Sequence, residues 1–347
     1  MIPGEEEKVL SGSTFISSKK LFVFVIFSVL IFALVALYGK IDDVLIALAA
    51  IPWYWVLPLM MILSFLNYII RYFKWQYYLH RINVHLSHRD SFSIFLAGFT
   101  LTATPGKIGE IVKGYFVQTH DGTPVAKTMP VVVSERVTDL LALVILAVLG
   151  FTFGINAGDQ ILAVLLLGGI ALAGAIVLGN RTFYQKILKR MTSFGPLKRF
   201  QDSCDLIEST MIQTLSPKPM LISTAVSVPG WFMECLELWI LLGLFRDASL
   251  PSFSIESLSL LLAATFIHSA ASIIGALTFS PGGVGTYEIT SMALIVFLLS
   301  TSETLASAAT ILIRVFTLWF SIIVGFVALA FITRRTRRTS KPTDIIA

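Results

Sequence analysis

Two stretches of this sequence are variants of one motif: Thr102–Glu110 reads TATPGKIGE, and Thr278–Glu288 reads TFSPGGVGTYE. Each contains a Pro-Gly pair and ends in a glutamate, and an arginine follows that glutamate after 26 positions, as Arg136 and as Arg314. This shared register predicts that one structural unit is used twice. In membrane proteins, paired Gly/Pro breaks in corresponding apolar segments point to a substrate site.

The composition is typical of a membrane protein. Of the 347 residues 56% are hydrophobic and only 14% are charged, and several apolar runs are long enough to cross a bilayer. We therefore predict an all-α, polytopic integral membrane protein with about six full transmembrane helices and two broken hairpins. The predicted spanning helices lie at 21–38, 52–73, 128–153, 160–179, 220–245 and 302–333. Lys40–Ala50 is expected to be a short connector.

The two motifs are expected to break helices within the membrane. In the first hairpin the arms 91–104 and 108–118 are too short to span, which predicts a re-entrant loop. The arms of the second, 256–279 and 284–300, are longer, and the sequence leaves open whether they span. The residues assigned to the breaks are Pro105, Gly106 and Gly109 in the first motif, and Pro281, Gly282, Gly283 and Gly285 in the second.

Positive charge predicts the orientation. Most of the 26 Lys and Arg residues, with Arg71 and Lys74 counted among them, fall in segments on the same side as the N-terminus, against Lys40 and Arg246 on the other. Basic segments face the cytoplasm, so both termini are predicted to be cytoplasmic and the protein to lie in the cell membrane. The two hairpins then enter from opposite faces, as in the inverted repeats of alternating-access transporters.

This orientation divides the chain as follows. A cytoplasmic tail covers 1–20 and a transmembrane domain covers 21–333, with repeat units at 52–153 and 219–333. A basic cytoplasmic linker covers 180–218, and a basic tail covers 334–347.

Charged residues inside apolar helices are functional candidates, because an ionised group at the bilayer centre costs about 2.5–3.5 kcal/mol. We expect Arg136 and Arg314 to converge on one cavity near the midplane, where guanidinium groups suit a phosphate. Lys107 in the first break adds a positive group, as do the N-termini of the half-helices. Glu110 and Glu288 either complement those helix dipoles or form salt bridges with the arginines that open during transport.

Other acidic residues have two interpretations. Glu135 and Asp139 either flank Arg136 in a pair that only stabilises the helix or take part in coupling. Glu234 and Glu237 either carry a coupling proton or are hydrogen-bonded to the last helix. His268 is expected to be a satisfied buried histidine. No catalytic residue, metal site or cofactor is predicted, because the histidines and cysteines lack metal-like spacing, and no base-reading basic patch indicates nucleic-acid binding.

Three motifs in order carry a family resemblance: TPGKIGE at 104–110, ERVTDL at 135–140 and SPGGVGTYE at 280–288. They resemble the flippase-like family built on the transmembrane region of lysylphosphatidylglycerol synthase, over roughly residues 20–335. In the synthase that names the family, this region is associated with moving an aminoacylated lipid across the membrane, and a separate soluble domain transfers the amino acid. The resemblance maps Glu110, Arg136, Glu288 and Arg314 onto the family's charged positions.

The resemblance implies lipid translocation rather than lipid synthesis. The chain ends at Ala347, soon after its last predicted helix, so we expect no acyltransferase domain and no enzymatic activity. The leading hypothesis is a translocase of an anionic phospholipid or a polyprenyl-phosphate-linked lipid, with membrane lipids as partners and a homo-oligomer left open. The alternatives are a membrane enzyme acting on lipid-linked groups and an ion-coupled transporter of a small soluble anion.

Overall fold

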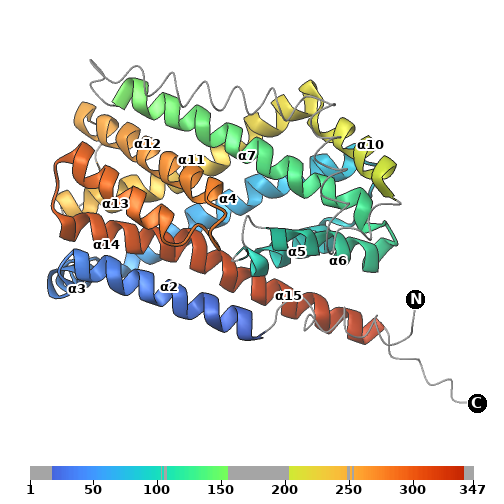
Figure 1. Cartoon of the computed structure of the whole chain (residues 1–347), viewed down its shortest axis with the longest axis horizontal. Coiled ribbons are helices and arrows are strands. Elements are labelled where there is room, and N and C mark those ends of the chain that lie inside the picture. Colours follow the sequence, from blue (N-terminus) through green and yellow to red (C-terminus); the bar gives the residue numbers. More distant parts are fainter. Residues whose placement is uncertain are drawn as a thin grey trace, which may run out of the picture.

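The elements of this protein are all helices in the part of the chain that its computed structural model describes (Figure 1). That part comprises residues 18–102, 104, 108–154, 203–247, 251 and 254–339. Several predicted features lie outside it: most of the two tails, the helix expected at 160–179, the linker up to residue 202, and Pro105, Gly106 and Lys107 of the first break.

The first half of the chain forms helices joined by short turns. The α-helices are α2 (Ser18–Tyr38), α3 (Ile41–Ala49), α4 (Trp53–Arg81), α5 (His88–Ala97), α6 (Val112–Asp121) and α7 (Val125–Gly154). Two 3₁₀ turns, η1 (Gly98–Leu101) and η2 (Ile108–Ile111), flank the first Pro-Gly break between α5 and α6.

The second half repeats the pattern of long helices around a break. Its α-helices are α10 (Cys204–Leu215), α11 (Pro217–Asp247), α12 (Ile255–Leu277), α13 (Thr286–Leu299), α14 (Glu303–Arg314) and α15 (Phe320–Thr339). A π-helical turn, η4 (Val315–Trp319), joins α14 to α15 directly after Arg314.

Four stretches among the described residues are long and apolar enough to cross a membrane, or five if the bent pair α2–α3 is counted as one span. They are Trp53–Arg81, Pro217–Arg246, Ile255–Leu277 and Glu303–Arg334. The protein is therefore a multi-pass membrane protein. The first arm of the second hairpin, α12, is long enough to span, whereas α13 is shorter.

The prediction of a connector at Lys40–Ala50 is wrong, because Ile41–Ala49 is the helix α3. The pair α2–α3 is bent by 96°, and Lys40 at the bend has a left-handed φ of 61°. Asp42 and Asp43 lie in the first turn of α3, where carboxylates stabilise the helix dipole. Thr304 at the start of α14 donates a hydrogen bond to the carbonyl of Gly39, which ties the bend to α14.

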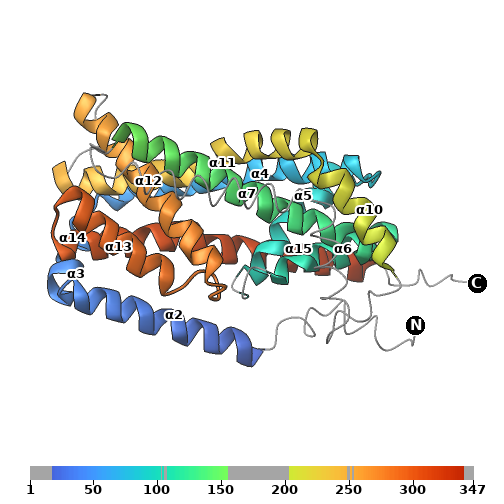
Figure 2. The ribbon, with the colours of Figure 1, turned by 45° about the horizontal axis from the view of Figure 1, so that its top comes forward.

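The two hairpins occupy different ends of the molecule. In Figure 1 α5 and α6 lie towards the right, near the ends of the chain, and α12 and α13 lie to the left. The view turned by 45° shows the same separation, with α7 and α11 running along both halves (Figure 2). The broken segments of both hairpins face the middle of the molecule, where they line a common cavity.

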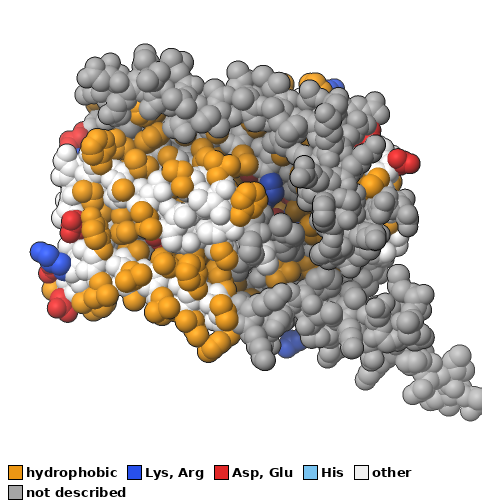
Figure 3. All heavy atoms as spheres, viewed as in Figure 1, with side chains coloured by type: hydrophobic (Ala, Val, Ile, Leu, Met, Phe, Trp, Pro, Cys, Tyr) orange, Lys and Arg blue, Asp and Glu red, His pale blue; other side chains and the backbone are white. Residues whose placement is uncertain are grey.

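The surface is largely apolar. Hydrophobic side chains cover much of the face in Figure 3, and acidic and basic side chains gather at its left end. On α2, side chains such as Phe22, Val29 and Leu34 are more than half exposed. Such a surface is stable in contact with lipid rather than water.

Close contact between α7 and α12 generates a prediction about stability. A Cβ atom at Gly150 would lie 2.6 Å from both the carbonyl oxygen of Leu262 and the backbone nitrogen of Phe266, whereas one at Gly230 would meet nothing closer than 3.5 Å. Gly150→Ala is therefore expected to destabilise the protein by about 1–3 kcal/mol. Gly230→Ala is the matched control, because alanine there only raises helix propensity by about 1 kcal/mol. Thermal unfolding in detergent measures both, and equal melting temperatures would contradict the packing.

Candidate functional site

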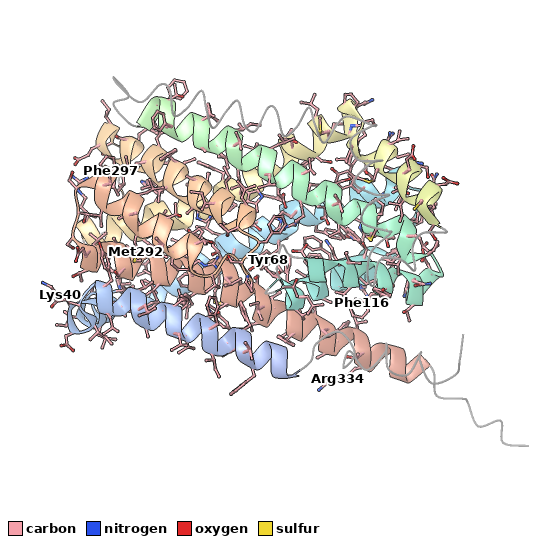
Figure 4. The ribbon with its side chains drawn as sticks, viewed as in Figure 1. Lys40, Tyr68, Phe116, Met292, Phe297 and Arg334 are labelled. Atoms are coloured by element: carbon pink, nitrogen blue, oxygen red, sulfur yellow. The ribbon has the colours of Figure 1, made fainter. Side chains whose placement is uncertain are left out.

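A cavity of about 230 Å³ lies between the two broken segments. Thr102 and Glu110 line it from the first hairpin, and Phe279, Gly282 and Gly283 line it from the second. Tyr68 of α4, another lining residue, is labelled near the middle of the molecule in Figure 4. The cavity is therefore in the interior of the helical bundle, far from both ends.

Three arginines from three helices line this cavity: Arg71 of α4, Arg136 of α7 and Arg314 of α14. The sequence predicted that Arg136 and Arg314 would meet, and the structure brings both to the same cavity. Guanidinium groups carry donors in a planar fork and remain ionised. The cavity is thus equipped with positive charge and hydrogen-bond donors.

The second break holds Arg314 in place. Its Nε lies 2.7 Å from Glu288 Oε1, and its Nη2 donates to the carbonyl of Gly282 at 2.6 Å. The other carboxylate oxygen of Glu288 accepts the backbone N–H of Gly285 at 2.6 Å. Glu288 therefore both caps α13 and forms an ion pair with Arg314.

Glycine is required in this break by the backbone. Gly282, Gly283 and Gly285 have φ values of 61°, 73° and 90°, a region that residues with a Cβ rarely adopt. Their left-handed turns direct the carbonyl of Gly282 to Arg314 and the N–H of Gly285 to Glu288.

The first break is built around a larger ion-pair network. Arg136 Nη2 lies 3.4 Å from Glu110 and 3.0 Å from Asp139. Lys113 of α6 contacts Glu135 at 2.6 Å and Glu110 at 3.7 Å. The pair Arg136–Asp139 is the helix-internal contact that the sequence suggested, but here it is one part of a network that also joins η2 and α6 to α7.

Two bases of α4 complete this network. Lys74 Nζ lies 2.5 Å from Asp139 Oδ1 and also reaches Ser227 of α11 at 2.8 Å. Arg71 Nη2 lies 3.6 Å from the other oxygen of Asp139. Lys74 is 1% and Arg71 6% exposed. The orientation argument counts Arg71 and Lys74 among the basic residues of cytoplasmic segments, and in the structure α4 continues to Arg81 and both side chains are buried in the bundle.

Arg71 is incompletely satisfied by hydrogen bonds. Its guanidinium lies over the rings of Phe99 and Trp231, at 5.6 Å and 5.5 Å from their centroids, and its buried Nε has no hydrogen-bond partner among the described residues. Arg136 is likewise incomplete, since neither its Nε nor its Nη2 has a hydrogen bond of good geometry. Buried donors without partners are costly, so these groups favour an anionic ligand in the cavity.

A second polar cluster borders the cavity beside Arg314. His268 of α12 contacts Glu234 at 3.2 Å through Nε2 and the hydroxyl of Tyr287 at 2.9 Å through Nδ1. The Tyr287 ring lies 4.7 Å from the Arg314 guanidinium. His268 is 1% exposed, in agreement with the prediction of a satisfied buried histidine. The hydrogen-bonding partners of Glu234 lie on α4 and α12 rather than on the last helix.

The predicted site residues thus fall into three groups. Those that line the cavity are Glu110, Arg136, Asp139, Glu234, Gly282, Gly283 and Arg314. Glu135, Glu237, Pro281, Gly285 and Glu288 are not among the lining residues, and Gly109 lies in η2. Pro105, Gly106 and Lys107 lie outside the described residues. Within the described residues, no group of three His, Cys, Asp or Glu side chains could hold a metal ion.

Sequence reasoning missed Arg71, Trp231 and Tyr68 as lining residues. A signal for Arg71 was present, because it lies inside the helix predicted at 52–73. Its recognition as a cavity residue required knowing which face of that helix meets α7 and α11.

The buried network predicts a large effect of one neutral substitution. Asp139→Asn removes the carboxylate that compensates Lys74, so the free energy of unfolding is expected to fall by about 3–5 kcal/mol. The control is Glu256→Gln, whose pair with Arg246 is exposed and is expected to contribute at most about 1 kcal/mol. Thermal unfolding in detergent compares them, and a Tm of Asp139→Asn equal to that of the control would show that Lys74 does not need this partner.

Comparison with known proteins gives one family. Residues 23–325 match the family described as the lysylphosphatidylglycerol synthase TM region, and no other domain is identified in the chain. Among curated proteins, none matches the chain. The matched region contains both Pro-Gly motifs, both arginines that follow them and every residue that lines the cavity. The chain therefore belongs to the lysylphosphatidylglycerol synthase TM-region family, as the three sequence motifs predicted.

Proposed function

We propose that this protein is a lipid translocase that moves an anionic phospholipid or a polyprenyl-phosphate-linked lipid across the cell membrane. The observation that carries the proposal is the under-coordinated Arg71, which shares one cavity with Arg136 and Arg314. Phosphate accepts bidentate hydrogen bonds from guanidinium groups. Three such groups at one cavity can replace the water that a phosphate headgroup loses inside the membrane.

The rim of the cavity suits a lipid. Leu277 and Phe279 belong to its lining, and they are 57% and 65% exposed. Leu140, Leu143 and Leu318 add apolar walls. A headgroup held by the arginines would leave its acyl chains to pass over this apolar rim into the bilayer.

In the proposed mechanism, the two Arg–Glu ion pairs break and re-form during transport. Without substrate, Glu110 and Glu288 compensate Arg136 and Arg314. A phosphate that binds the arginines competes with these carboxylates, and each carboxylate belongs to a broken segment. Substrate binding would therefore loosen one hairpin from the helix that carries its arginine, which opens or closes access from that side.

This mechanism uses the chain as an inverted repeat with both termini in the cytoplasm. The first hairpin would then open towards the cytoplasm and the second towards the outside, so that alternate release of Glu110 and Glu288 exposes the cavity to each side in turn. The opposite placement of the hairpins along the long axis (Figure 1) supports this arrangement.

The size of the cavity favours one further candidate function. About 230 Å³ holds a phosphate headgroup but not acyl chains, so a small soluble anion would fit the same arginines. The two functions share the chemistry of the site and differ in whether lipid reaches it from the bilayer.

The arginines generate the main prediction. Arg71→Gln is expected to slow movement of fluorescent phosphatidylglycerol in proteoliposomes by about 10–100-fold, because one charge-assisted hydrogen bond to phosphate contributes about 1.5–3 kcal/mol. Arg314→Lys keeps the positive charge next to Glu288 but loses the bidentate donors of the guanidinium group. It should reduce the rate of lipid movement without unfolding the protein. Arg246→Gln, an exposed arginine at the end of α11, is the control. Wild-type rates in both cavity variants would refute the assignment.

Native mass spectrometry distinguishes lipid from small anion. The purified wild-type protein is expected to retain a phosphate-containing lipid, and Arg71→Gln is expected to lose most of it. Retention of inorganic phosphate without lipid, again sensitive to Arg71→Gln, would instead identify the cavity as a soluble-anion site.

A further inference from the structure

Two buried carboxylates next to the cavity have no Lys or Arg partner among the described residues. Glu234 and Glu237 lie one turn apart on α11 and are 7% and 0% exposed. Among the described residues neither forms an ion pair with Lys or Arg, and the charged group that acts on Glu237 is Glu234, a second carboxylate. Two ionised carboxylates in a buried site are strongly unfavourable, so such a pair retains at least one proton.

The contacts of Glu237 are compatible with such a proton. The hydroxyl oxygen of Ser64 on α4 lies 2.7 Å from Glu237 Oε1 and 3.3 Å from the carbonyl oxygen of Phe316. Ser64 has one hydrogen, and an ionised carboxylate and a carbonyl are both acceptors. An ionised Glu237 accepts this hydrogen, whereas a protonated Glu237 can itself donate to Ser64 and leave the Ser64 hydrogen for Phe316. The second oxygen of Glu237, Oε2, has no hydrogen-bond partner among the described residues.

Glu234 differs from its neighbour in having donors. Asn67 Nδ2 lies 3.2 Å from its Oε1, and His268 Nε2 lies 3.2 Å from its Oε2. If Tyr287 donates to His268 Nδ1, the other nitrogen of the ring carries the hydrogen towards Glu234. Glu234 therefore has a polar neighbour at each of its oxygens, whereas Glu237 has only Ser64 among the described residues.

Phe316 connects this proton to the anion site. It belongs to the π-helical turn Val315–Trp319, which begins directly after Arg314. Such turns occur frequently at functional sites, and their carbonyls are less regularly bonded than those of an α-helix. Loss of the Glu237 proton would draw the Ser64 hydrogen away from Phe316 and leave this carbonyl without its side-chain partner.

Titratable and charged side chains of the neighbouring helices surround the two carboxylates. They are Tyr68 and Arg71 on α4, Asp139 on α7, Cys235 on α11 itself, His268 on α12, Tyr287 and Glu288 on α13, and Arg314 on α14. Asp139 and Glu288 are already paired with bases. Glu234 and His268 also line the cavity, so a bound anion and a proton at this cluster attract each other.

We propose that Glu237 binds and releases one proton and that this proton couples to anion binding at Arg314 through Ser64 and the π-turn. The inference rests on the proposed translocase function and supplies its driving force, the transmembrane proton gradient. By linkage, protonation strengthens anion binding and anion binding strengthens protonation by the same factor. Lipid and proton would then move in the same direction.

The proton site is tested first without transport. Infrared difference spectroscopy of the detergent-solubilised protein at neutral pH should show the carbonyl band of a protonated carboxyl group, sensitive to deuteration and absent in Glu237→Gln. Glutamine keeps an N–H donor for Ser64, so this variant should fold. Glu256→Gln, at an exposed carboxylate, should leave the band unchanged. Absence of such a band in the wild type, or its survival in Glu237→Gln, overturns the proposal.

The coupling is tested in phosphatidylcholine vesicles that contain a minor fraction of fluorescent phosphatidylglycerol. In the wild type, a gradient of about one pH unit should shift the lipid towards the alkaline leaflet by up to about tenfold for one coupled proton. Glu237→Gln and Ser64→Ala should move lipid with no response to the gradient, whereas Glu256→Gln should respond like the wild type.

The outcomes separate the two proposals. Lipid movement in the wild type that ignores the gradient would overturn the coupling and leave the translocase function intact. Failure of the wild type to move lipid would overturn the translocase function. In that case pH titration of the infrared band still decides whether Glu237 binds a proton. A band that does not change with pH would refute reversible proton binding by Glu237.

Discussion

Charge compensation inside an apolar bundle is the constraint on which this structure depends. Asp139 has a central part in it, because this one carboxylate lies within 3.6 Å of Arg71, Lys74 and Arg136. These contacts tie α4 to α7, and Glu110 extends them to the first break. Burying each charge alone would cost several kcal/mol. Ion pairing therefore stabilises the centre of the bundle. Because Glu110 takes part in it, the first broken segment also contributes to that stability.

The same constraint makes the cavity suitable for an anion. Among the described residues, four bases face three acids in the network around the first break, and Arg71 contributes a donor that no group there accepts. At the second break Arg314 and Glu288 balance each other. On α11 the imbalance is of the opposite sign, because neither Glu234 nor Glu237 has a Lys or Arg partner in the described part of the chain. A phosphate and a proton are the two ligands that would complete these opposite deficits, which is why we infer that they bind together.

The sequence predicted the positions of the breaks because proline and glycine act locally on the backbone. It placed Arg136 and Arg314 in one site because identical spacing from two glutamates implies equivalent positions. It failed for Arg71 and Lys74, since apolar periodicity does not reveal which end of a long helix stays buried. Ser64 carries no signal at all in the sequence, although it links Glu237 to the π-turn. A serine in an apolar helix acquires a role only from the groups that the neighbouring helices bring to it.

By itself, therefore, the sequence determined the membrane class, the family, the two helix breaks and the shared spacing of glutamate and arginine, because these depend on composition, local backbone chemistry and repetition. Only the tertiary structure decided that each arginine pairs with its glutamate, that one cavity unites three arginines, that Asp139 is shared among three bases, and that the two glutamates of α11 have no Lys or Arg partner among the described residues. Each of these depends on contacts between helices far apart in the chain, and the pairing of charges in a low-dielectric interior is a property of that packing rather than of any single segment.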